Sequence, residues 1–198
     1  AEHLDFYRAL DHIREVFTTL ATQTRGKLVY CAEDPVAHEL CSSRENTVSY
    51  GWEDADYTAS EIRDLKGSSA FTVMKQGAPL GDIELGIPGN HNILNALAAI
   101  ALADSCGAEF PHIARALSTF AGAKRRFETK YLSANYRIVD DYGHHPSELA
   151  ATLQTARSLK PKRLVVLFQP HRYTRTQALA EDFGKVLQAA DRVFISDV

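Results

Sequence analysis

Titratable side chains gather just before a predicted helix, in the stretch VDDYGHHPSELAATLQTAR at residues 139–157. Four of them precede Pro146, namely Asp140, Asp141, His144 and His145. Proline suits the first position of a helix, where unpaired backbone N–H groups attract anions. In the simplest structural interpretation, one aspartate caps the helix and one histidine bonds within the loop. Four such groups in one loop instead favour a site that meets a substrate or a phosphate.

A second polar segment, QPHRYTRT, carries Arg172 and Arg175 three residues apart. This spacing would put both guanidinium groups on one side of a helical turn, where they could hold a carboxylate or a phosphate. Paired surface arginines are common, so the pair is weak evidence by itself. Its predicted position beside the histidine loop is what gives it weight.

Two asparagines, Asn92 and Asn95, stand three residues apart at the start of an otherwise apolar helix. Their amides would face one way, and such amides can read the donor and acceptor edge of a base. The alternative is that Asn90 or Asn92 is only an N-cap, which leaves Asn95 unexplained.

The remaining candidates are weaker. Arg125 and Arg126 suit phosphate contacts but are equally normal in a solvated linker, and His3 by itself is most safely taken as exposed. Adjacent His144 and His145 rarely chelate one ion, and the sequence has neither a His-x-x-x-His pair nor a C-x-x-C motif. A structural zinc site is therefore rejected, and the three cysteines are interpreted as reduced thiols.

The C-terminal part of the chain is predicted to have the element order β-α-β-α-β. The predicted elements are a strand at 136–142, a helix at 145–158, a strand at 162–169, a helix at 176–190 and a strand at 191–198. Right-handed crossovers make such strands parallel, so the loops after the first two strands should meet at one edge of the sheet. Open parallel sheets bind ligands at that edge.

The preceding part mixes helices and short strands, and a Gly-containing basic connector separates it from the C-terminal part. Helices are predicted at 7–21, 34–41, 89–107 and 111–120, with a buried strand at 27–32 and an antiparallel meander over 46–88. Asn90 is the expected N-cap of the third helix and Gly107 its C-terminal stop.

Composition limits the class of protein. The 198 residues are 45% hydrophobic and 24% charged, which is typical of a globular chain with one good core or two small ones. The formal charge of −3 and scattered basic residues argue against nucleic-acid binding. No run is long enough to span a membrane and no secretory signal is present, so we expect a cytoplasmic protein.

Five ordered motifs together resemble the Mur ligase family: EHLDFY, GNHNILNALAAIALA, GAKRRFE, VDDYGHHPSELAATL and FQPHRYTRT. The resemblance covers essentially the whole chain. It implies an α/β fold, in which residues 1–124 are the later part of a central ATP-binding domain with a mixed sheet. Residues 125–198 would be the first part of a Rossmann-like C-terminal domain that receives the amino acid.

The resemblance also implies site residues. Asn92 and Asn95 would contact adenine, Arg126 and Asp141 would contact the nucleotide, and Tyr142 could stack on the base. His3 matches a histidine that helps to hold Mg²⁺. The positions that approach the incoming amino acid and the reacting carboxylate are matched by His144, Arg172 and Arg175.

The implied activity is ATP-dependent joining of L-alanine to UDP-N-acetylmuramate through an acyl phosphate, in peptidoglycan precursor synthesis. The family's G-x-x-G-K-[ST] phosphate loop is absent from this sequence, so we expect a fragment that is inactive alone. The alternatives are a ligase that recycles a preformed tripeptide and a non-catalytic nucleotide- or amino-acid-binding module. An oxidoreductase is disfavoured because no G-x-G-x-x-G follows a predicted strand, and the oligomeric state is left open.

Overall fold

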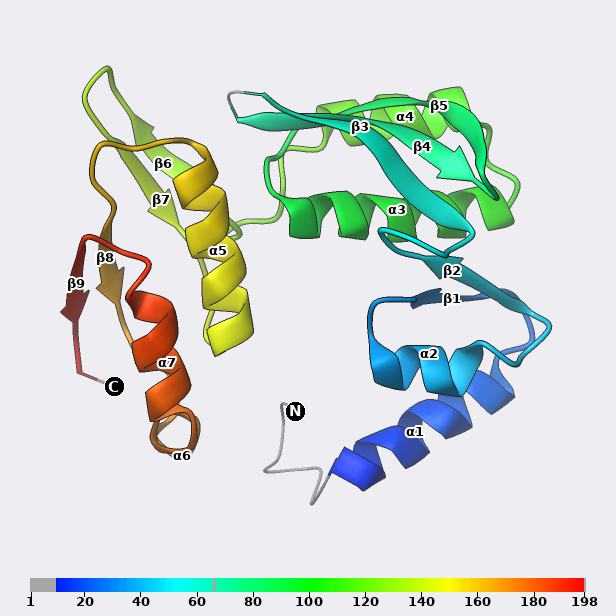
Figure 1. Cartoon of the computed structure of the whole chain (residues 1–198), viewed down its shortest axis with the longest axis horizontal. Helices are drawn as coiled ribbons and strands as arrows, with labels where there is room; N and C mark the ends of the chain where they lie inside the picture. The colour runs from blue at the N-terminus through cyan, green and yellow to red at the C-terminus, as the bar shows by residue number, and fades with distance from the viewer. Residues whose placement is uncertain (1–9, 66, 198) are drawn as a thin grey trace. The chain divides into compact units, whose positions relative to one another are not determined.

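The structure is a computed structural model that describes residues 10–65 and 67–197. Its helices are α1 (Leu10–Gln23), α2 (Pro35–Cys41), α3 (Asn90–Ser105), α4 (Phe110–Thr119), α5 (Pro146–Ser158), α6 (Tyr173–Ala178) and α7 (Ala180–Leu187). Its strands are β1 (Leu28–Cys31), β2 (Thr47–Tyr50), β3 (Tyr57–Leu65), β4 (Ser68–Lys75), β5 (Ala78–Leu85), β6 (Glu128–Leu132), β7 (Arg137–Asp140), β8 (Val165–Phe168) and β9 (Arg192–Ile195) (Figure 1).

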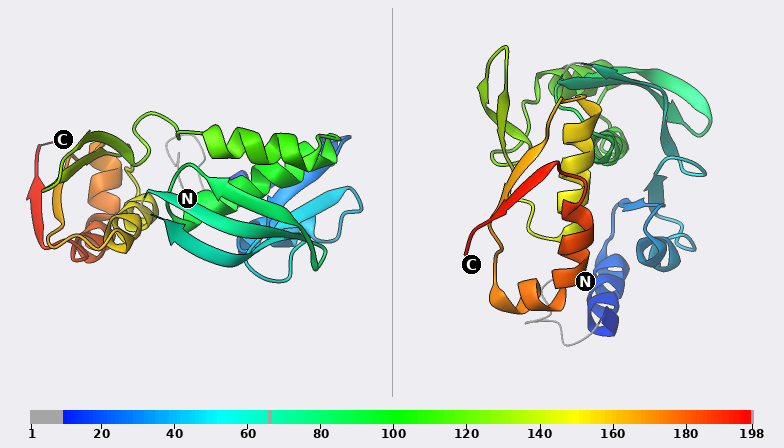
Figure 2. Two further views of the ribbon diagram at one scale, coloured as in Figure 1. Left: turned by 90° about the horizontal axis from the view of Figure 1, so that it is seen from above. Right: turned by 60° about the vertical axis from the view of Figure 1, so that its left-hand side comes forward.

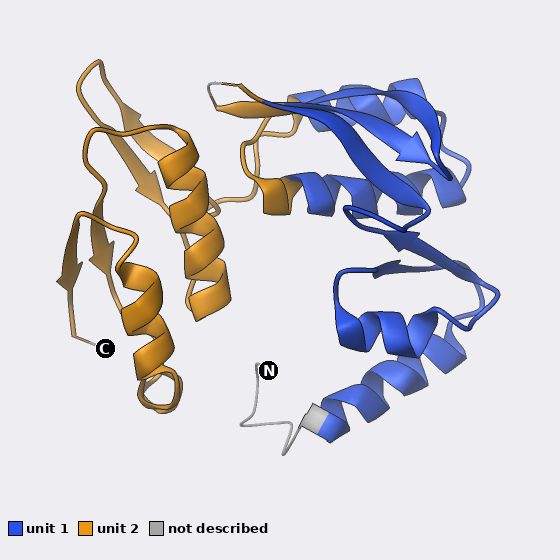
Figure 3. Cartoon of the chain, viewed as in Figure 1, with its two compact units in different colours: residues 1–63, 70–84, 93–118 blue, residues 64–69, 85–92, 119–198 orange. Residues whose placement is uncertain are grey.

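The chain divides into two compact units, which are described separately (Figure 3). Unit 1 comprises residues 1–63, 70–84 and 93–118, and unit 2 comprises residues 64–69, 85–92 and 119–198. The mixed α/β architecture expected from the sequence is confirmed, with a mixed sheet first and a parallel strand pair near the C-terminus.

The first five strands form one sheet in the order β1-β2-β3-β4-β5. β1 is parallel to β2, and β2 is parallel to β3 through the pair Tyr50 and Tyr57. The predicted antiparallel meander is therefore wrong at its first step. The reason is local, because the Asp56 carboxylate accepts hydrogen bonds from the backbone N–H and the hydroxyl of Ser49. These bonds stabilise a wide loop in place of a hairpin turn.

β4 and β5 do form a hairpin with a two-residue connection. Gln76 and Gly77 both have positive φ, at 50° and 79°, as the favoured tight hairpin turns require. On the strands beyond this turn, Phe71, Val73 and Ile83 are fully buried or nearly so.

α3 and α4 lie on the same side of these strands (Figure 2). α3 buries residues that recur at helical spacing, namely Ile93, Ala96, Leu97, Ile100 and Ala101. The helix starts at Asn90, one residue earlier than its predicted role as N-cap requires. Gly107 ends it as predicted, with φ of 85° and an Ala108 N–H that donates to Ala103 O at 3.0 Å.

A polar cluster ties β3 and β4 to the end of α3. The hydroxyl of Tyr57, whose side chain is buried, donates to Asp104, and Lys75 Nζ lies 2.6 Å from the same carboxylate. The hydrogen bond from Lys75 and that from Tyr57 hold the pKa of Asp104 below its ordinary value.

Unit 2 departs in part from the predicted β-α-β-α-β arrangement. β8 and β9 pair in parallel, as expected. β7 instead pairs antiparallel with β6, a strand that the sequence reading missed, and no ladder joins β7 to β8 within the described residues. β6 was missed because the basic segment AGAKRRFE at residues 121–128 is typical of a linker. The residues of β6, Glu128–Leu132, begin at the end of that segment and are mostly exposed.

The core of unit 2 lies between the strand pair and two helices. Its buried members are Leu149, Leu153, Phe168, Phe183 and Leu187, from α5, β8 and α7. Phe168 and Phe183 pack with ring centroids 5.2 Å apart. The helix predicted at 176–190 is broken at Leu179 into α6 and α7. This core fixes the N-terminus of α5, where the polar loop of the sequence lies.

Candidate functional site

The loop between β7 and α5 is held by the carboxylate of Asp141. Its Oδ2 accepts the N–H of Phe127 at 2.8 Å, and its Oδ1 accepts the N–H of Gly143 at 2.7 Å. A Cβ at position 143 would lie 2.7 Å from Oδ1, so glycine suits this close approach. Asp141 thus joins the connector at 125–127 to the histidine loop and does not cap α5.

The cap of α5 is His145. Its Nδ1 accepts the N–H of Ser147 at 3.4 Å and contacts the Ser147 hydroxyl at 2.8 Å. Glu148, the third helical residue, completes a capping box by accepting the N–H of His145 at 3.2 Å. The alternative in which an aspartate caps the helix is wrong, since an imidazole nitrogen of His145 accepts that bond.

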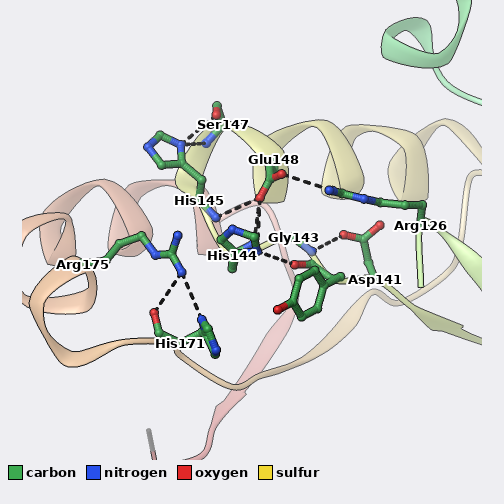
Figure 4. A network of polar contacts seen from close by, with 10 residues as sticks. Arg126, Asp141, Gly143, His144, His145, Ser147, Glu148, His171 and Arg175 are labelled. Atoms are coloured by element: carbon green, nitrogen blue, oxygen red, sulfur yellow. Dashed lines mark hydrogen bonds and ion pairs between the residues drawn. The ribbon is translucent and has the colours of Figure 1, made fainter. Parts of the chain in front are cut away.

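Glu148 makes two further contacts (Figure 4). Its Oε2 accepts the N–H of His144 at 3.0 Å, and its Oε1 lies 3.2 Å from a guanidinium nitrogen of Arg126. Burial tends to raise the pKa of Glu148, but the bonds from His144 and Arg126 outweigh it and hold that pKa below its ordinary value. The side chain is therefore an anion at neutral pH.

His144 is fixed at its ring as well as its backbone. Nδ1 lies 2.9 Å from the carbonyl oxygen of Tyr142, so Nδ1 carries the hydrogen and Nε2 is the acceptor nitrogen of the neutral ring. His145 has the opposite arrangement, because its Nδ1 accepts. In these two adjacent histidines, Nδ1 thus has different partners: the Tyr142 carbonyl for His144 and the Ser147 N–H for His145.

The two polar loops meet, as the sequence predicts. The ring of His171 lies 6.1 Å from His144 and 6.4 Å from Tyr142, measured between centroids. Arg175 reaches back from α6, where a guanidinium nitrogen lies 3.2 Å from both Nδ1 and the carbonyl oxygen of His171 (Figure 4). Arg172 precedes α6 with a φ of 69°, in the left-handed region.

The basic connector packs on the same loop. The guanidinium of Arg125 lies over the ring of Tyr142 at 4.7 Å and pairs with Asp140 at 3.4 Å. One face of Tyr142 is therefore covered by a cation, and a base could stack only on the other. Arg126, an exposed residue, turns its guanidinium to Glu148 instead.

The other predicted residues lie elsewhere. Asn92 and Asn95 are on α3; Asn92 donates from Nδ2 to Pro88 O at 2.7 Å, and Asn95 is exposed. His3 lies outside the described residues, so its predicted metal role is untouched by the structure. Among residues 10–65 and 67–197, no group of three His, Cys, Asp or Glu side chains is placed to hold a metal ion.

Three residues near the candidate site were not predicted from the sequence, namely Glu148, His171 and His91. Glu148 was hidden because a capping box is normally recognised from Ser or Thr at the N-cap, and here the N-cap is histidine. His171 stands between Pro170 and Arg172, in a segment quoted only for its arginines. His91 follows Asn90, and burial lowers its pKa while Asp141 opposes that change and Arg126 reinforces it.

The fold and this loop define an α/β protein whose carboxylate, imidazole and guanidinium groups converge at a strand-to-helix junction. Family models agree with that class. Residues 1–103 match the Mur ligase middle domain, and residues 125–197 match the domain described as Mur ligase, glutamate ligase domain. The chain belongs to the Mur ligase family.

Curated relatives resemble the chain over its whole length. UDP-N-acetylmuramate–L-alanine ligase from Nitratidesulfovibrio vulgaris is 42% identical over 201 residues, covering 100% of this chain and 44% of that protein. The protein of the same name from Syntrophotalea carbinolica is 41% identical over 202 residues, again covering 100% and 44%. The chain thus spans less than half the length of these relatives.

Solved structures agree. UDP-N-acetylmuramate-alanine ligase MurC from Thermotoga maritima has a TM-score of 0.84 at 34% identity, covering 100% of this chain and 44% of that one. MurF ligase from Thermotoga maritima, solved in complex with ADP, has a TM-score of 0.80 at 18% identity, covering 98% and 46%. The second likeness shows the fold alone. None of the described helices is long and apolar enough to cross a membrane.

Proposed function

We propose that this protein takes part in the ATP-dependent joining of L-alanine to UDP-N-acetylmuramate, a step of peptidoglycan precursor synthesis in the cytoplasm. The observation that carries the proposal is the convergence of His144, His171 and Arg175 next to the Arg126–Glu148 pair. Relatives that are about 40% identical over the whole chain are named UDP-N-acetylmuramate–L-alanine ligases, which supports the same substrates.

The nucleotide is assigned to Arg126, Asp141 and the two asparagines. Asp141 already accepts two N–H groups, yet each carboxylate oxygen has a second lone pair, which a ribose hydroxyl could use. Because Nδ2 of Asn92 donates to Pro88, its Oδ1 is the atom suited to the amino group of adenine. Asn95, whose side chain is exposed, is assigned to the base from the family resemblance, and Tyr142 is assigned to stack on it through the ring face that Arg125 does not cover.

His144 is assigned as the proton acceptor for the ammonium group of L-alanine. With its hydrogen held on Nδ1 by the Tyr142 carbonyl, its Nε2 presents a lone pair that can accept the proton before the amine attacks. Arg172 and Arg175 are assigned to the carboxylates of alanine and of the sugar nucleotide, since guanidinium groups bind carboxylates through paired N–H donors.

ATP would supply the phosphoryl group that activates the carboxylate of UDP-N-acetylmuramate. Mg²⁺ and its proposed ligand His3 follow from the family resemblance alone. The described residues contain no group that fits a metal ion, so no step is assigned to it.

The start of the C-terminal family match at residue 125 supports a domain boundary between residues 124 and 125, whereas the last division between the compact units falls at residues 118 and 119. The family models leave a gap between residues 103 and 125, within which α4 ends and an exposed connector begins. We therefore assign residues 1–124 to the later part of the ATP-binding domain and residues 125–198 to the amino-acid-binding domain.

The test is phosphate release from ATP and Mg²⁺ by the protein as its gene encodes it, given UDP-N-acetylmuramate with either L-alanine or the tripeptide. Turnover with L-alanine supports the proposal. Turnover with the tripeptide alone would assign the protein to the recycling branch, and turnover with neither would favour a binding module. His144→Gln should lower the rate by about 10²-fold or more if His144 accepts the proton, and full retention of rate across acidic pH would refute that role.

A further inference from the structure

Glu148 joins two parts of the candidate site that are assigned to different substrates. One carboxylate oxygen contacts Arg126, on the nucleotide side, at 3.2 Å. The other accepts the N–H of His144, on the amino-acid side, at 3.0 Å. A single anionic side chain therefore lies between the two.

A capping box alone does not require the contacts of Glu148 with Arg126 and His144. It requires only that the third helical residue accept the N–H of the N-cap residue, which Glu148 does for His145. The additional bond to His144 and the ion pair with Arg126 go beyond capping. Glu148 is about three-tenths exposed and Arg126 about half exposed, so a solute can reach the pair.

Glu148 also controls how His144 is held. The backbone N–H of His144 donates to Glu148, while its ring donates to the Tyr142 carbonyl. The Glu148 carboxylate thus holds the backbone from which the imidazole projects, and the Tyr142 carbonyl holds the ring itself. The position of that carboxylate thus affects the nitrogen that His144 presents to a substrate.

Arg126 cannot serve two anions equally. A polyphosphate carries more negative charge than one carboxylate and offers more acceptor oxygens, so it competes for the guanidinium group. When a bound polyphosphate draws the guanidinium of Arg126 away, Oε1 of Glu148 loses its partner. The carboxylate then keeps only its hydrogen bonds to the backbone N–H groups of His144 and His145.

We propose that Glu148 is a positioning residue that couples the anion bound at Arg126 to the orientation of His144. The proposal rests on the proposed function for the identity of the two ligands, but the coupling itself needs only Arg126, Glu148 and His144. Because coupling between two sites is reciprocal, a nucleotide that strengthens alanine binding must itself bind more tightly when alanine is present.

The first experiment measures the coupling without any substrate. The backbone amide resonances of His144 and His145 are recorded in protein labelled with ¹⁵N-histidine and assigned through His144→Gln and His145→Gln. Arg126→Gln should move both resonances when Glu148 is present and leave them nearly unmoved in a Glu148→Gln background. Equal movements in both backgrounds would overturn the proposal. Asp182→Asn, which removes an exposed partner of Lys185 in α7, is the matched control.

The second experiment measures L-alanine affinity with and without a non-hydrolysable ATP analogue in the protein as encoded. The analogue should tighten alanine binding on the order of tenfold in the wild type and should leave the alanine affinity of Glu148→Gln nearly unchanged. Undiminished coupling in Glu148→Gln would overturn the inference. Failure of the wild type to bind alanine at all would refute the proposed function instead, and the resonance experiment would then decide the coupling by itself.

Discussion

At the scale of single residues, two carboxylates organise the candidate site by bonding to the backbone. Asp141 accepts N–H groups from Phe127 and Gly143, and Glu148 accepts those of His144 and His145. Charge-assisted bonds of this kind are stronger than neutral ones. The candidate side chains therefore stand on a loop whose backbone is held by hydrogen bonds to two carboxylates.

Replacing Glu148 with Gln should lower the free energy of unfolding at pH 7 by about 1 kcal/mol, after allowance for partial solvent exposure. The pKa of Glu148 is lower in the folded chain than its ordinary value of 4.5. Its stabilising effect is therefore complete above pH 4.5 and is lost as the pH falls through the folded-state pKa. Urea unfolding of the wild type and of Glu148→Gln from pH 7 to pH 3 should show that the difference in their free energies of unfolding shrinks in acid. A constant difference would contradict this account.

At the scale of elements, close approaches between backbone and side chains decide how strands and helices pack. Gly81 on β5 lies so near α4 that an added Cβ would be 2.3 Å from the ring of Phe110. Gly184, inside α7, has nothing within 4 Å of its Cβ position. Close packing therefore explains a glycine at position 81 but does not explain one at position 184.

Gly81→Ala should destabilise the protein by roughly 1–3 kcal/mol, because the ring of Phe110 must move within a packed interface. Gly184→Ala is the matched control and should stabilise it by about 0.5–1 kcal/mol, since alanine favours a helix interior. Thermal unfolding of both variants tests the pair. An unchanged melting temperature for Gly81→Ala would mean that β5 and α4 are farther apart than the structure has them.

Strand β8 has one packed face and one open face. Phe168 is buried against α7, whereas the neighbouring Leu167 is 77% exposed. Phe168→Ala should cost about 3–5 kcal/mol, and Leu167→Ala no more than about 0.5 kcal/mol. Denaturant midpoints of the two variants would check this, and similar losses for both would refute the assignment of faces.

At the scale of the whole molecule, an exposed segment lies between the regions that match the two family models. Residues 120–123, between α4 and the basic connector, have no regular structure. Lys124 and Arg125 are exposed there. Exposed irregular segments are the preferred sites of proteolytic cleavage.

Limited digestion with trypsin should therefore cut first at Lys124 or Arg125 and yield products that begin at residue 125 or 126. Mass spectrometry of the earliest products identifies the site, and Lys124→Gln should slow the cut after residue 124 without affecting cuts elsewhere. A first cut inside a described helix or strand would contradict the boundary proposed at residue 125.

Local patterns in the sequence were enough to predict most elements and the ends of several. Pro35 after Asp34 marked α2, Gly107 marked the end of α3, and alternating strands and helices marked the parallel pair β8–β9. These features depend on backbone dihedral preferences and caps, which act over a few residues. The convergence of the two polar loops was also predicted, although β7 pairs with β6 and the expected ladder between β7 and β8 is absent from the described residues.

Only the tertiary structure decided the partners. The sequence identified Asp141 and His144 as candidates, but not that Asp141 would bond to Phe127, that Glu148 would bridge Arg126 and His144, or that β7 would pair with β6. The antiparallel meander failed at β2 and β3 for a local reason, since Asp56 accepts two hydrogen bonds from Ser49 and a wide loop replaces the predicted turn. The contacts of Asp141 with Phe127 and of Glu148 with Arg126 join residues 14 and 22 positions apart, so they depend on packing between segments distant in sequence.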